Sequence, residues 1–411
     1  MKEVLIVGGG AAGMMAAVTA AREGCAVRLF ERNEKLGKKI YITGKGRCNL
    51  TNACETEEFL GNVVSNPRFL YRALYGFSNR DTADFFEKAG LALKTERGNR
   101  VFPVSDKASD VIKALTREME KAGVRVCLNS RVTGLLAEEG RVFGIRLADG
   151  REIPGDAVLI ATGGLSYPST GSQGDGFLLA ESVGHAVTDC SPALVPFETG
   201  EEWAKELQGL SLRNVEVTIF DGKKKLYREF GEMLFTHFGV SGPAVLSGSS
   251  RAAKAIRKHP LTLEINFKPA LTREQLDARL LREFEANKNK YFKNALGALL
   301  PARMVPVMAD FCEIGLKREI NGISREERGR LADGLRHFQM TLTGLRGYPE
   351  AIVTQGGVCV KEVDPATMAS KKVQGLYFAG EVLDVDAYTG GYNLQIAWST
   401  GRAAGQGIAS S

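Results

Sequence analysis

The feature that most constrains this chain is a glycine-rich turn near its N-terminus, set between two short apolar runs. The run Val4–Val7 is followed by Gly8-Gly9-Gly10-Ala11-Ala12-Gly13, then by an alanine-rich segment and by a second apolar stretch that ends at Glu31. This order predicts a strand, a tight turn, a helix, a second strand and an acidic residue. In that context the pattern G-x-G-x-x-G indicates a dinucleotide-binding α/β unit, whereas a glycine turn alone also joins strands to helices that bind nothing.

Each glycine of the turn has its own task in such a unit. Gly8 permits the tight turn, Gly10 lets the backbone approach a pyrophosphate, and Gly13 lets the helix pack closely on the strand. The first turn of the helix, which includes Ala12, would present unpaired N–H groups to the phosphates. Glu31, at the end of the second strand, is placed to accept a hydrogen bond from a ribose hydroxyl.

Length and net charge restrict the possible fold and function only loosely. The chain has 411 residues, enough for two or three domains with substantial cores, and 44% hydrophobic with 25% charged residues is ordinary for a globular protein. It has 54 Lys and Arg against 48 Asp and Glu, a formal net charge of +6. This mild excess favours an anionic substrate or a nucleic acid, and a solvated surface with surplus lysine explains it equally simply.

Cysteine usage indicates a reducing compartment. The seven cysteines are scattered at Cys25, Cys48, Cys54, Cys127, Cys190, Cys312 and Cys359. No C-x-x-C pair and no cluster of histidine and cysteine occurs, so we expect neither a disulfide framework nor a zinc or other metal site. The uncharged stretch 4–21 contains four glycines and the turn described above, which argues against a signal peptide or a membrane span. We therefore expect a cytoplasmic protein that does not enter a membrane.

Hydrophobic periodicity gives a coarse order of elements. The stretch 35–52, rich in Gly, Lys and Asn, is typical of a loop or helix start that crosses polar ligand groups. The first part of the chain further predicts these elements: a helix over 105–122, a strand over 124–128, a hairpin over 142–153 closed by Asp149-Gly150, and a buried strand over 157–160. Gly174-Asp175-Gly176 reads as a turn before a helix, with Asp175 as its N-cap.

From about residue 192 the pattern changes. Alternating residues over 215–220 and 225–235 predict a hairpin, with Lys223–Lys225 solvated at its tip. The stretch 272–344 reads as helical, with capping boxes at Thr272/Gln275 and Ser324/Glu327 and an apolar stripe at Leu276, Leu280, Leu281 and Phe284. A last strand over 376–381 and a helix over 392–408 close the chain. We expect a discontinuous domain of 1–191 and 345–411, a β-rich insertion of 192–270 completed by residues near 335–355, and a helical subdomain of 271–344.

The C-terminal segment extends the pattern beyond the first glycine turn. Gly380-Glu381 after an apolar strand, followed by Gly390-Gly391-Tyr392-Asn393-Leu394-Gln395, resembles the second FAD signature of two-half flavoproteins. In those proteins the acid binds the ribityl chain and the following helix points its N-terminus at the flavin. Such a helix end stabilises the negative charge that builds at N1 and O2 of the reduced flavin.

Several long motifs resemble the BaiN/YhiN family of flavoproteins, which includes aminoacetone oxidase and proteins proposed to reduce bile-acid intermediates. These motifs are Thr43–Asn52 (TGKGRCNLTN), Gly171–Gly176 (GSQGDG), Leu234–Pro243 (LFTHFGVSGP) and Thr354–Val358 (TQGGV). The resemblance implies non-covalent FAD and a glutathione-reductase-like, Rossmann-type FAD-binding domain with inserted β-barrel and helical domains over the flavin. It leaves the substrate open. One departure is Lys45, where the family usually has glycine. This lysine either adds charge near the flavin or points to solvent, and we favour the latter.

The glycine turn and the resemblance together imply a set of cofactor-binding residues: Gly8, Gly10, Ala12, Gly13, Glu31, Arg32, Lys39, Gly46, Arg47, Asn49, Val132, Ala161, Thr162, Gly163, Gly380, Glu381, Asp386, Gly391, Asn393 and Leu394. Four residues are candidates for catalysis: Arg47, Cys48, His237 and Tyr388. Arg47 offers a fork to a phosphate or a substrate carboxylate. A catalytic dithiol is disfavoured because Cys54, the cysteine next to Cys48, stands at C-x₅-C. His237 is either a general acid or a core histidine, and Tyr388 either orients substrate or packs in its loop.

The leading hypothesis is an FAD-dependent oxidoreductase that moves a hydride between flavin N5 and a small organic substrate bound where the inserted domains meet the FAD domain. No second G-x-G-x-x-G follows a strand, so NADH or NADPH would bind only transiently as electron donor. The alternatives are an amine oxidase that uses dioxygen, as aminoacetone oxidase does, and an RNA-modifying or redox-sensing flavoprotein. The chain shows no interleaving of basic and aromatic residues typical of a nucleic-acid surface, so we do not expect nucleic acid as a partner. The oligomeric state is open.

Overall fold

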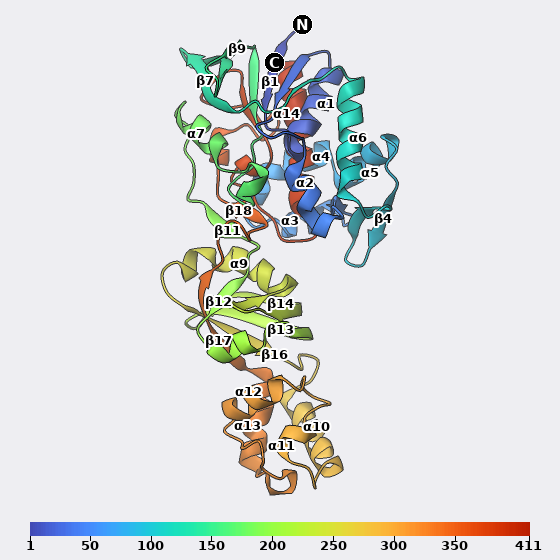
Figure 1. Ribbon diagram of the computed structural model, residues 1–411, viewed down its shortest axis with the longest axis vertical. Coiled ribbons are helices and arrows are strands. Elements are labelled where there is room, and N and C mark those ends of the chain that lie inside the picture. Colours follow the sequence, from blue (N-terminus) through green and yellow to red (C-terminus); the bar gives the residue numbers. More distant parts are fainter. The chain divides into compact units, whose positions relative to one another are not determined.

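The computed structural model describes residues 1–411 and divides into two compact units (Figure 1). The discontinuous unit consists of Met1–Pro192 and Tyr348–Ser411, and the inserted unit consists of Ala193–Gly347. The sequence placed these divisions after residues 191 and 344. Each unit has its own hydrophobic core, and the two are described separately below.

A five-stranded parallel sheet forms the centre of the discontinuous unit, in the order β19-β10-β1-β2-β6. The strands are β1 (Glu3–Val7), β2 (Ala26–Phe30), β6 (Arg125–Cys127), β10 (Ala157–Ile160) and β19 (Leu376–Phe378). Val7 pairs with Ile160 on one side and with Phe30 on the other, so β1 is central. It is flanked by strands on both edges and covered on both faces, which is why it is a continuous apolar run.

Two helices from opposite ends of the chain pack against each other in this unit: α1 (Ala11–Arg22) and α14 (Tyr392–Ser410) (Figure 1). Small residues allow the close approach. A Cβ built on Gly401 would lie 2.4 Å from the carbonyl oxygen of Ala12, and one on Gly405 would lie 2.6 Å from Cβ of Thr19. The helix α6 (Ala108–Lys121) also packs on α1. The N-terminal half of the unit therefore depends on the last residues of the chain.

Shorter elements complete the discontinuous unit. Between β2 and β6 lie α2 (Lys38–Ile42), η1 (Thr43–Gly46), β3 (Thr51–Asn52), α3 (Thr56–Gly61), η2 (Pro67–Leu70), α4 (Tyr71–Gly76), α5 (Asn79–Lys88), β4 (Leu93–Glu96), β5 (Arg100–Pro103) and α6. After β6 come β7 (Val132–Glu138), β8 (Arg141–Leu147), β9 (Glu152–Pro154), η3 (Pro168–Thr170), α7 (Asp175–Glu181), β11 (Ser191–Ala193), β18 (Val353–Gln355), η5 (Val360–Glu362) and η6 (Gly380–Val382). The hairpin expected over 142–153 is β8–β9.

The inserted unit is a closed six-stranded barrel with helices. The strand order is β12-β15-β14-β13-β16-β17, with β12 (Phe197–Thr199), β13 (Ser211–Asp221), β14 (Lys224–Phe235), β15 (Gly239–Ser241), β16 (Leu261–Asn266) and β17 (Phe338–Leu345). The helices are α8 (Glu202–Glu206), α9 (Pro243–Ile256), α10 (Arg273–Ala286), α11 (Phe292–Ala295), α12 (Met304–Phe311), η4 (Ile320–Gly322) and α13 (Arg325–Arg336). Closure leaves no free sheet edge.

The prediction that residues 272–344 are helical is wrong at the end of this stretch. Residues 338–345 form β17, which pairs with β16 and with β12 and so closes the barrel. The reason is a period of two, because Phe338, Met340 and Leu342 are buried while the residues between them are exposed. Both predicted capping boxes are present at the starts of α10 and α13. Leu281 leaves the predicted stripe, since its side chain is 47% exposed.

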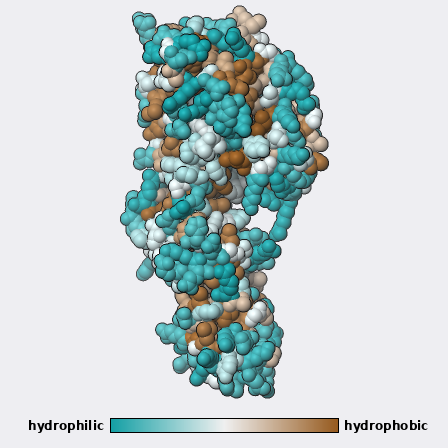
Figure 2. Space-filling view, in the orientation of Figure 1, coloured by the Kyte–Doolittle hydropathy of each residue, from teal (hydrophilic) through white to brown (hydrophobic).

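No helix of this structure combines the length and the apolar character that a membrane crossing requires. Hydrophilic side chains cover most of the face drawn in Figure 2, with apolar residues scattered among them.

Candidate functional site

The glycine turn forms the start of the site, between β1 and α1. Gly8 has φ +109°, and a Cβ there would lie 2.5 Å from the carbonyl oxygen of Ala161; a Cβ on Gly13 would lie 2.0 Å from that of Gly8. The protein's own packing therefore requires both glycines. Gly10 differs, because a Cβ there would meet nothing within 4 Å and its φ of −88° suits any residue. Open space in front of Gly10 is what the approach of a pyrophosphate needs.

The first turn of α1 faces this space with free donors. Its first intrahelical bond runs from Met14 N to Gly10 O, so the N–H groups of Ala11, Ala12 and Gly13 have no helical partner. The N-cap Gly10 has no side chain that could bind them. Donors at a helix N-terminus favour an anion, and these three adjoin Gly10, where a Cβ would meet no protein atom within 4 Å.

Glu31 lies at the end of β2 and is 8% exposed. Its Oε2 accepts from Gly9 N at 2.8 Å, and its Oε1 accepts from Asn33 N at 2.8 Å and from Asn33 Nδ2 at 2.7 Å. An ionised carboxylate has about four acceptor positions, so one remains for a ribose hydroxyl. Glu31 therefore also holds the glycine turn in place, a role that the sequence did not reveal.

A second helix N-terminus belongs to the same unit. The N-cap of α14 is Gly391 (φ +98°), and a Cβ there would lie 2.3 Å from the carbonyl oxygen of Thr51. The first intrahelical bond runs from Gln395 N to Gly391 O, which leaves the N–H groups of residues 392–394 unpaired within the helix. The Asn393 side chain binds Ala387 N and O at 2.9 and 2.8 Å, so it fixes the preceding loop. Asn393 and Leu394 thus offer backbone donors.

The loop 43–52 is fixed to this helix start. Asn52 Nδ2 donates to Gly390 O at 2.9 Å, and Thr51 Oγ1 donates to Gln395 Oε1 at 2.7 Å. In the same loop Asn49 Oδ1 is buried without any hydrogen-bond partner. A buried acceptor that lacks a donor is costly unless a ligand supplies one. Asn49 is one of the residues that the sequence assigned to the cofactor.

A lysine and a glutamate of the predicted cofactor-binding set bind each other. Lys39 Nζ contacts Glu381 Oε2 and donates to Ser166 Oγ at 2.6 Å, while Glu381 Oε1 accepts from Ser166 Oγ at 2.7 Å and from Thr354 N at 2.8 Å. This network joins α2, η6 and the segments after β10 and around β18. Ser166 and Thr354 were missed as site residues. Thr354 lies in a motif that the sequence singled out without assigning it a role, and no local signal marks Ser166.

The end of β10 contributes a second unpartnered polar atom. Thr162 Oγ1 is buried without a hydrogen-bond partner, and the adjacent Gly163 (φ +74°) approaches Ser172, where a Cβ would lie 2.4 Å from Oγ. Ala161, just after β10, is buried against the glycine turn. The orphaned acceptors of Asn49 and Thr162 both belong to the predicted cofactor set.

Arg32 follows β2 in the sequence, and Val132 begins β7. Arg32 Nη1 bonds Asp175 Oδ2 at 2.9 Å, and Arg131 bonds the same carboxylate with two nitrogens at 2.9 and 3.1 Å. The expectation that Asp175 is an N-cap is wrong: Gly174, with φ +86°, is the N-cap of α7 and Asp175 is its first residue. Val132 is buried at the start of β7.

Arg47 is engaged within the protein. Its guanidinium bonds Glu96 and Asp106, with Nε 2.8 Å from Asp106 Oδ1, and lies 4.2 Å from the ring centroid of Phe102. Hydrogen bonds from Arg47 lower the pKa of Glu96, and those from Lys94 and then Arg47 lower the pKa of Asp106. Its use as a ligand for phosphate or substrate stays a prediction, and these contacts point to a role in fixing the loop.

Cys48 is fully buried with φ +59°. Burial raises the pKa of its thiol to about 12, which disfavours the thiolate at neutral pH. Burial also raises the pKa of Cys54, to about 11. These thiols are therefore poorly suited to the attack that dithiol chemistry requires. The exposed Lys45 has φ +58°, a conformation that glycine adopts more readily, and its exposure agrees with the solvent-facing interpretation.

The remaining candidates lie in different units. Tyr388 is half-buried and follows Asp384 and Asp386 in the discontinuous unit. Its backbone N donates to Asn62 O at 3.0 Å. Asp386 nearby is 1% exposed, and Gln355 Nε2 lies 3.3 Å from its Oδ2.

His237 is exposed between β14 and β15 of the inserted unit, with its ring 4.9 Å from that of Phe238. Gly46 has φ +84°, and a Cβ built there would meet no protein atom within 4 Å. A Cβ built on Gly380 would lie 2.8 Å from Cβ of Ala12.

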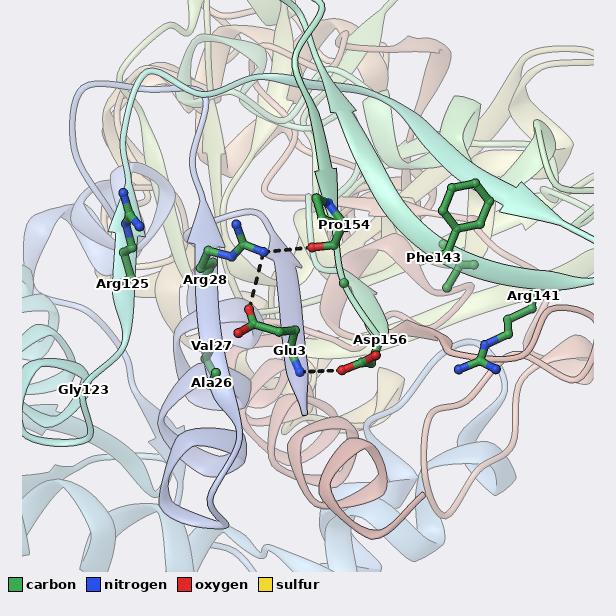
Figure 3. A pocket seen from close by; sticks show the side chains of 12 residues that line it. Glu3, Ala26, Val27, Arg28, Gly123, Arg125, Arg141, Phe143, Pro154 and Asp156 are labelled. Atoms are coloured by element: carbon green, nitrogen blue, oxygen red, sulfur yellow. Dashed lines mark hydrogen bonds and ion pairs between the residues drawn. The ribbon is translucent and has the colours of Figure 1, made fainter. Parts of the chain in front are cut away.

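A broad hollow of about 680 Å³ lies at the opposite edge of the sheet (Figure 3). It is lined by residues where strands begin, among them Glu3, Ala26 and Arg125. Inside it Arg28 Nη2 donates to Pro154 O at 2.8 Å and lies 3.4 Å from Glu3. Ligands of open parallel sheets bind beyond the carboxyl ends of the strands, so this hollow is not the dinucleotide site.

The cradle at the carboxyl edge fits FAD. It offers two helix N-termini with free N–H groups, a glycine with open space for a pyrophosphate, an acidic residue with one acceptor position left, and two buried polar atoms without partners. The fold and this cradle define a flavoenzyme of the Rossmann type with an inserted barrel.

The comparison with known proteins agrees. The description "HI0933-like protein Rossmann domain" matches residues 2–407, and the chain belongs to this family of FAD-dependent oxidoreductases. It is 33% identical to the 3-dehydro-bile acid delta(4,6)-reductase of Clostridium scindens, over 100% of this chain and 99% of that protein. It is 34% identical to the ribosomal RNA dihydrouridine synthase of Escherichia coli, over 99% and 98%.

Solved structures share the fold at low identity. The 3-ketosteroid Δ4-(5α)-dehydrogenase of Rhodococcus jostii is 17% identical with a TM-score of 0.53, covering 100% of this chain and 97% of that one. The 3-ketosteroid Δ1-dehydrogenase of Sterolibacterium denitrificans is 14% identical with a TM-score of 0.56, and each chain is covered completely.

Proposed function

We propose that this protein is an FAD-dependent reductase that saturates a carbon–carbon double bond conjugated to a carbonyl group, with NADH or NADPH as electron donor. One observation carries the proposal. Two relatives that match almost the whole chain carry names with unrelated substrates but the same bond change. A 3-dehydro-Δ4,6 steroid is a conjugated dienone, and dihydrouridine is uridine whose C5–C6 double bond, conjugated to a ring carbonyl, has been reduced.

The chemistry has two halves in either substrate. A hydride adds to the β-carbon and a proton adds to the α-carbon, so that the double bond becomes a single bond. When bound, FAD supplies the hydride from N5. The free N–H groups of residues 392–394 would hold the flavin by its pyrimidine oxygen and stabilise negative charge there. The helix α1 and Gly10 would hold the pyrophosphate.

The proton donor is a separate group. We propose Tyr388 for this role, because it is half-buried and belongs to the loop that Asn393 fixes before α14. His237 is the second candidate, since it lies in a motif shared with the family. Cys48 is the weakest of the candidates, because burial keeps its thiol protonated and raises its pKa far above neutrality. Seven cysteines that form no disulfide fit a reducing compartment, and we infer a cytoplasmic site of action.

Anaerobic stopped-flow mixing tests the proposal. NADH or NADPH should bleach the flavin absorbance saturably, and the reduced protein should then be reoxidised by a 3-oxo-Δ4,6 steroid or by uridine-containing RNA. Tyr388→Phe should slow reoxidation by about 10²-fold or more, the usual contribution of a general acid, and leave bleaching by nucleotide unchanged. His237→Gln serves as the matched variant. If neither nucleotide bleaches the flavin while aminoacetone does so, the amine oxidase alternative holds.

A further inference from the structure

A lysine and a glutamate from opposite ends of the chain form an ion pair in the cofactor cradle. Lys39 lies in α2 and Glu381 in η6, and their side chains are 22% and 20% exposed. A Cβ built on Gly163 would lie 3.9 Å from Glu381 Oε2, and one built on Gly380 would lie 2.8 Å from Cβ of Ala12. The ion pair therefore borders the segment after β10 and the start of α1, two parts of the site proposed for FAD.

Two further residues hold the carboxylate in one orientation. Glu381 Oε1 accepts from Ser166 Oγ at 2.7 Å and from Thr354 N at 2.8 Å. Ser166 is fully buried, and its hydroxyl also accepts from Lys39 Nζ at 2.6 Å. Thr354 Oγ1 in turn accepts from the backbone N of Leu165 and of Ser166 at 2.7 and 3.1 Å. The two charges thus belong to a closed network that fixes both of them.

This network leaves one hydrogen-bond donor and one acceptor unused. An ammonium group has three N–H donors, and Lys39 uses two of them, toward Glu381 and Ser166. A carboxylate has about four acceptor positions, and Glu381 uses three. A hydroxyl group both donates and accepts, so a hydroxyl of the ribityl chain of FAD is able to bind the lysine and the glutamate together.

The two charges also neutralise each other. Lys39 has no second carboxylate within 4.0 Å, and Glu381 has no second cation. Removal of either member would leave one uncompensated charge in a partly buried position. Such a charge acts over about 10 Å, which is far enough to reach a cofactor bound beside it. Charge near the flavin is one of the properties by which a protein tunes its electronics.

We propose that Lys39 is a positioning residue: it orients Glu381 for the ribityl hydroxyls and, by neutralising it, sets the redox potential of the flavin. The proposal deepens the proposed function and rests on FAD in the cradle, but not on the double bond that is reduced. Two electrons and one proton convert oxidised flavin to an anion. Without Lys39 the charge of Glu381 disfavours that anion, and without the carboxylate the charge of Lys39 favours it.

The redox potential of the FAD-loaded variants tests the proposal. Xanthine and a catalytic amount of xanthine oxidase reduce the flavin together with a dye of known potential, and the two absorbances give the potential. The variants are Lys39→Gln, Glu381→Gln, the double variant and the conservative Lys39→Arg. Lys372→Met is the matched control, because Lys372 pairs with Glu362 at 2.6 Å in the same unit and neither residue belongs to the predicted cofactor set.

The two single variants should shift the potential in opposite directions. At a fixed dye ratio we expect the oxidised-to-reduced ratio of the flavin to rise about tenfold in Lys39→Gln, or ~30 mV toward lower potential, and to fall by a similar factor in Glu381→Gln. The double variant restores the balance of charge, so it should lie within about threefold of the parent protein. Lys39→Arg and Lys372→Met should leave the ratio unchanged.

FAD affinity gives a second measurement that does not depend on turnover. Titration of the apoproteins with FAD should show binding weakened about tenfold in both single variants, because each removes one partner of the ribityl hydroxyl, and restored in Lys39→Arg. An ion pair that only stabilises the fold would weaken binding without moving the potential. Potentials that stay at the parent value in both single variants, or that shift in the same direction, would therefore overturn the proposal. Each single variant has its own expected sign, so one that retains FAD is sufficient.

The dye equilibrium separates this proposal from the proposed function, since it uses neither NADH nor an enone substrate. If the potentials shift as expected but the flavin is neither reduced by NADH or NADPH nor reoxidised by the 3-oxo-Δ4,6 steroid, the reductase is wrong and the role of Lys39 stands. If the protein reduces the steroid while both single variants keep the parent potential, the role of Lys39 is wrong and the reductase stands.

Discussion

The two units differ in where they keep their polar groups. The discontinuous unit buries them: Glu31, Asp386, Ser166 and Gln395 are all less than 9% exposed and are hydrogen-bonded around the cradle. The inserted unit has an almost wholly apolar core and carries its charge outside. Short-range hydrogen bonding fixes a cofactor, whereas surface charge acts on a partner from a distance. The polar groups of the discontinuous unit are therefore placed to hold a cofactor, whereas those of the inserted unit face solvent.

The largest expected effect concerns the apolar core of the inserted unit. Phe338 is fully buried, with the rings of Trp203, Phe267 and Phe311 between 4.7 and 5.8 Å away. Phe338→Ala should lower the free energy of unfolding of this unit by about 3–5 kcal/mol. Calorimetry of the FAD-loaded protein should show one transition lowered and the flavin absorbance retained. Loss of FAD at room temperature would show that the units do not divide their tasks as described.

Glu31→Gln tests the polar side of the comparison. The carboxylate accepts three hydrogen bonds within the protein, so its replacement should weaken both the glycine turn and the ribose contact. We expect a loss of roughly 1.5–3 kcal/mol in FAD binding, the range for hydrogen bonds to charged groups, and a lower Tm of the apoprotein. Titration with FAD and thermal unfolding measure the two. An unchanged apoprotein Tm would show that Glu31 acts only as a ribose ligand and does not stabilise the glycine turn.

Gly10→Ala separates ligand binding from folding. Because a Cβ at Gly10 meets no protein atom, the apoprotein should keep its stability, while FAD binding should weaken at least tenfold, or ~1.4 kcal/mol. Gly61→Ala, in the same unit and also facing open space, is the control and should change neither. Unaltered FAD affinity in Gly10→Ala would mean that the pyrophosphate lies elsewhere.

The smallest effect is a pH dependence. The His185 side chain is fully buried against Phe378, and burial lowers its pKa below the ordinary value despite the opposing effect of Glu362. As the pH falls, the unfolded chain therefore takes up this proton first, and the free energy of unfolding decreases from about pH 6.5 downward. One proton limits the slope to ~1.4 kcal/mol per pH unit. Denaturant unfolding of His185→Gln between pH 7 and 5.5 should lack this slope.

Local patterns predicted the parts of the fold that depend on neighbouring residues. The glycine turn, the strands on either side of it and the capping boxes of α10 and α13 all depend on a few consecutive residues. The sequence predicts that residues near 335–355 complete the barrel but sets no bounds for β17, because a helical stretch precedes this strand directly and its partners, β12 and β16, are distant in sequence. Periodicity alone does not tell where one element ends and the next begins.

The candidate site shows the same limit. Its predicted members include residues whose contacts no short motif encodes: Lys39 with Glu381, and Arg47 with Glu96. These ion pairs join residues that only the tertiary fold brings together. The sequence therefore named the residues but not their partners: it did not foresee that Arg47 binds Glu96, and the ligand role of Arg47 stays a prediction.

The pairing of β10 with β19 has a consequence for how the chain is made. Val158 lies beside Leu376 in the sheet, so the whole inserted unit is synthesised between two neighbouring strands. Joining such distant segments costs little more entropy than joining nearer ones, but it slows folding. The strand pairs that close the barrel all lie within residues 197–345, so the barrel is complete before α14 has been synthesised. The cofactor cradle is complete only after α14 has been synthesised, so we expect FAD to bind last.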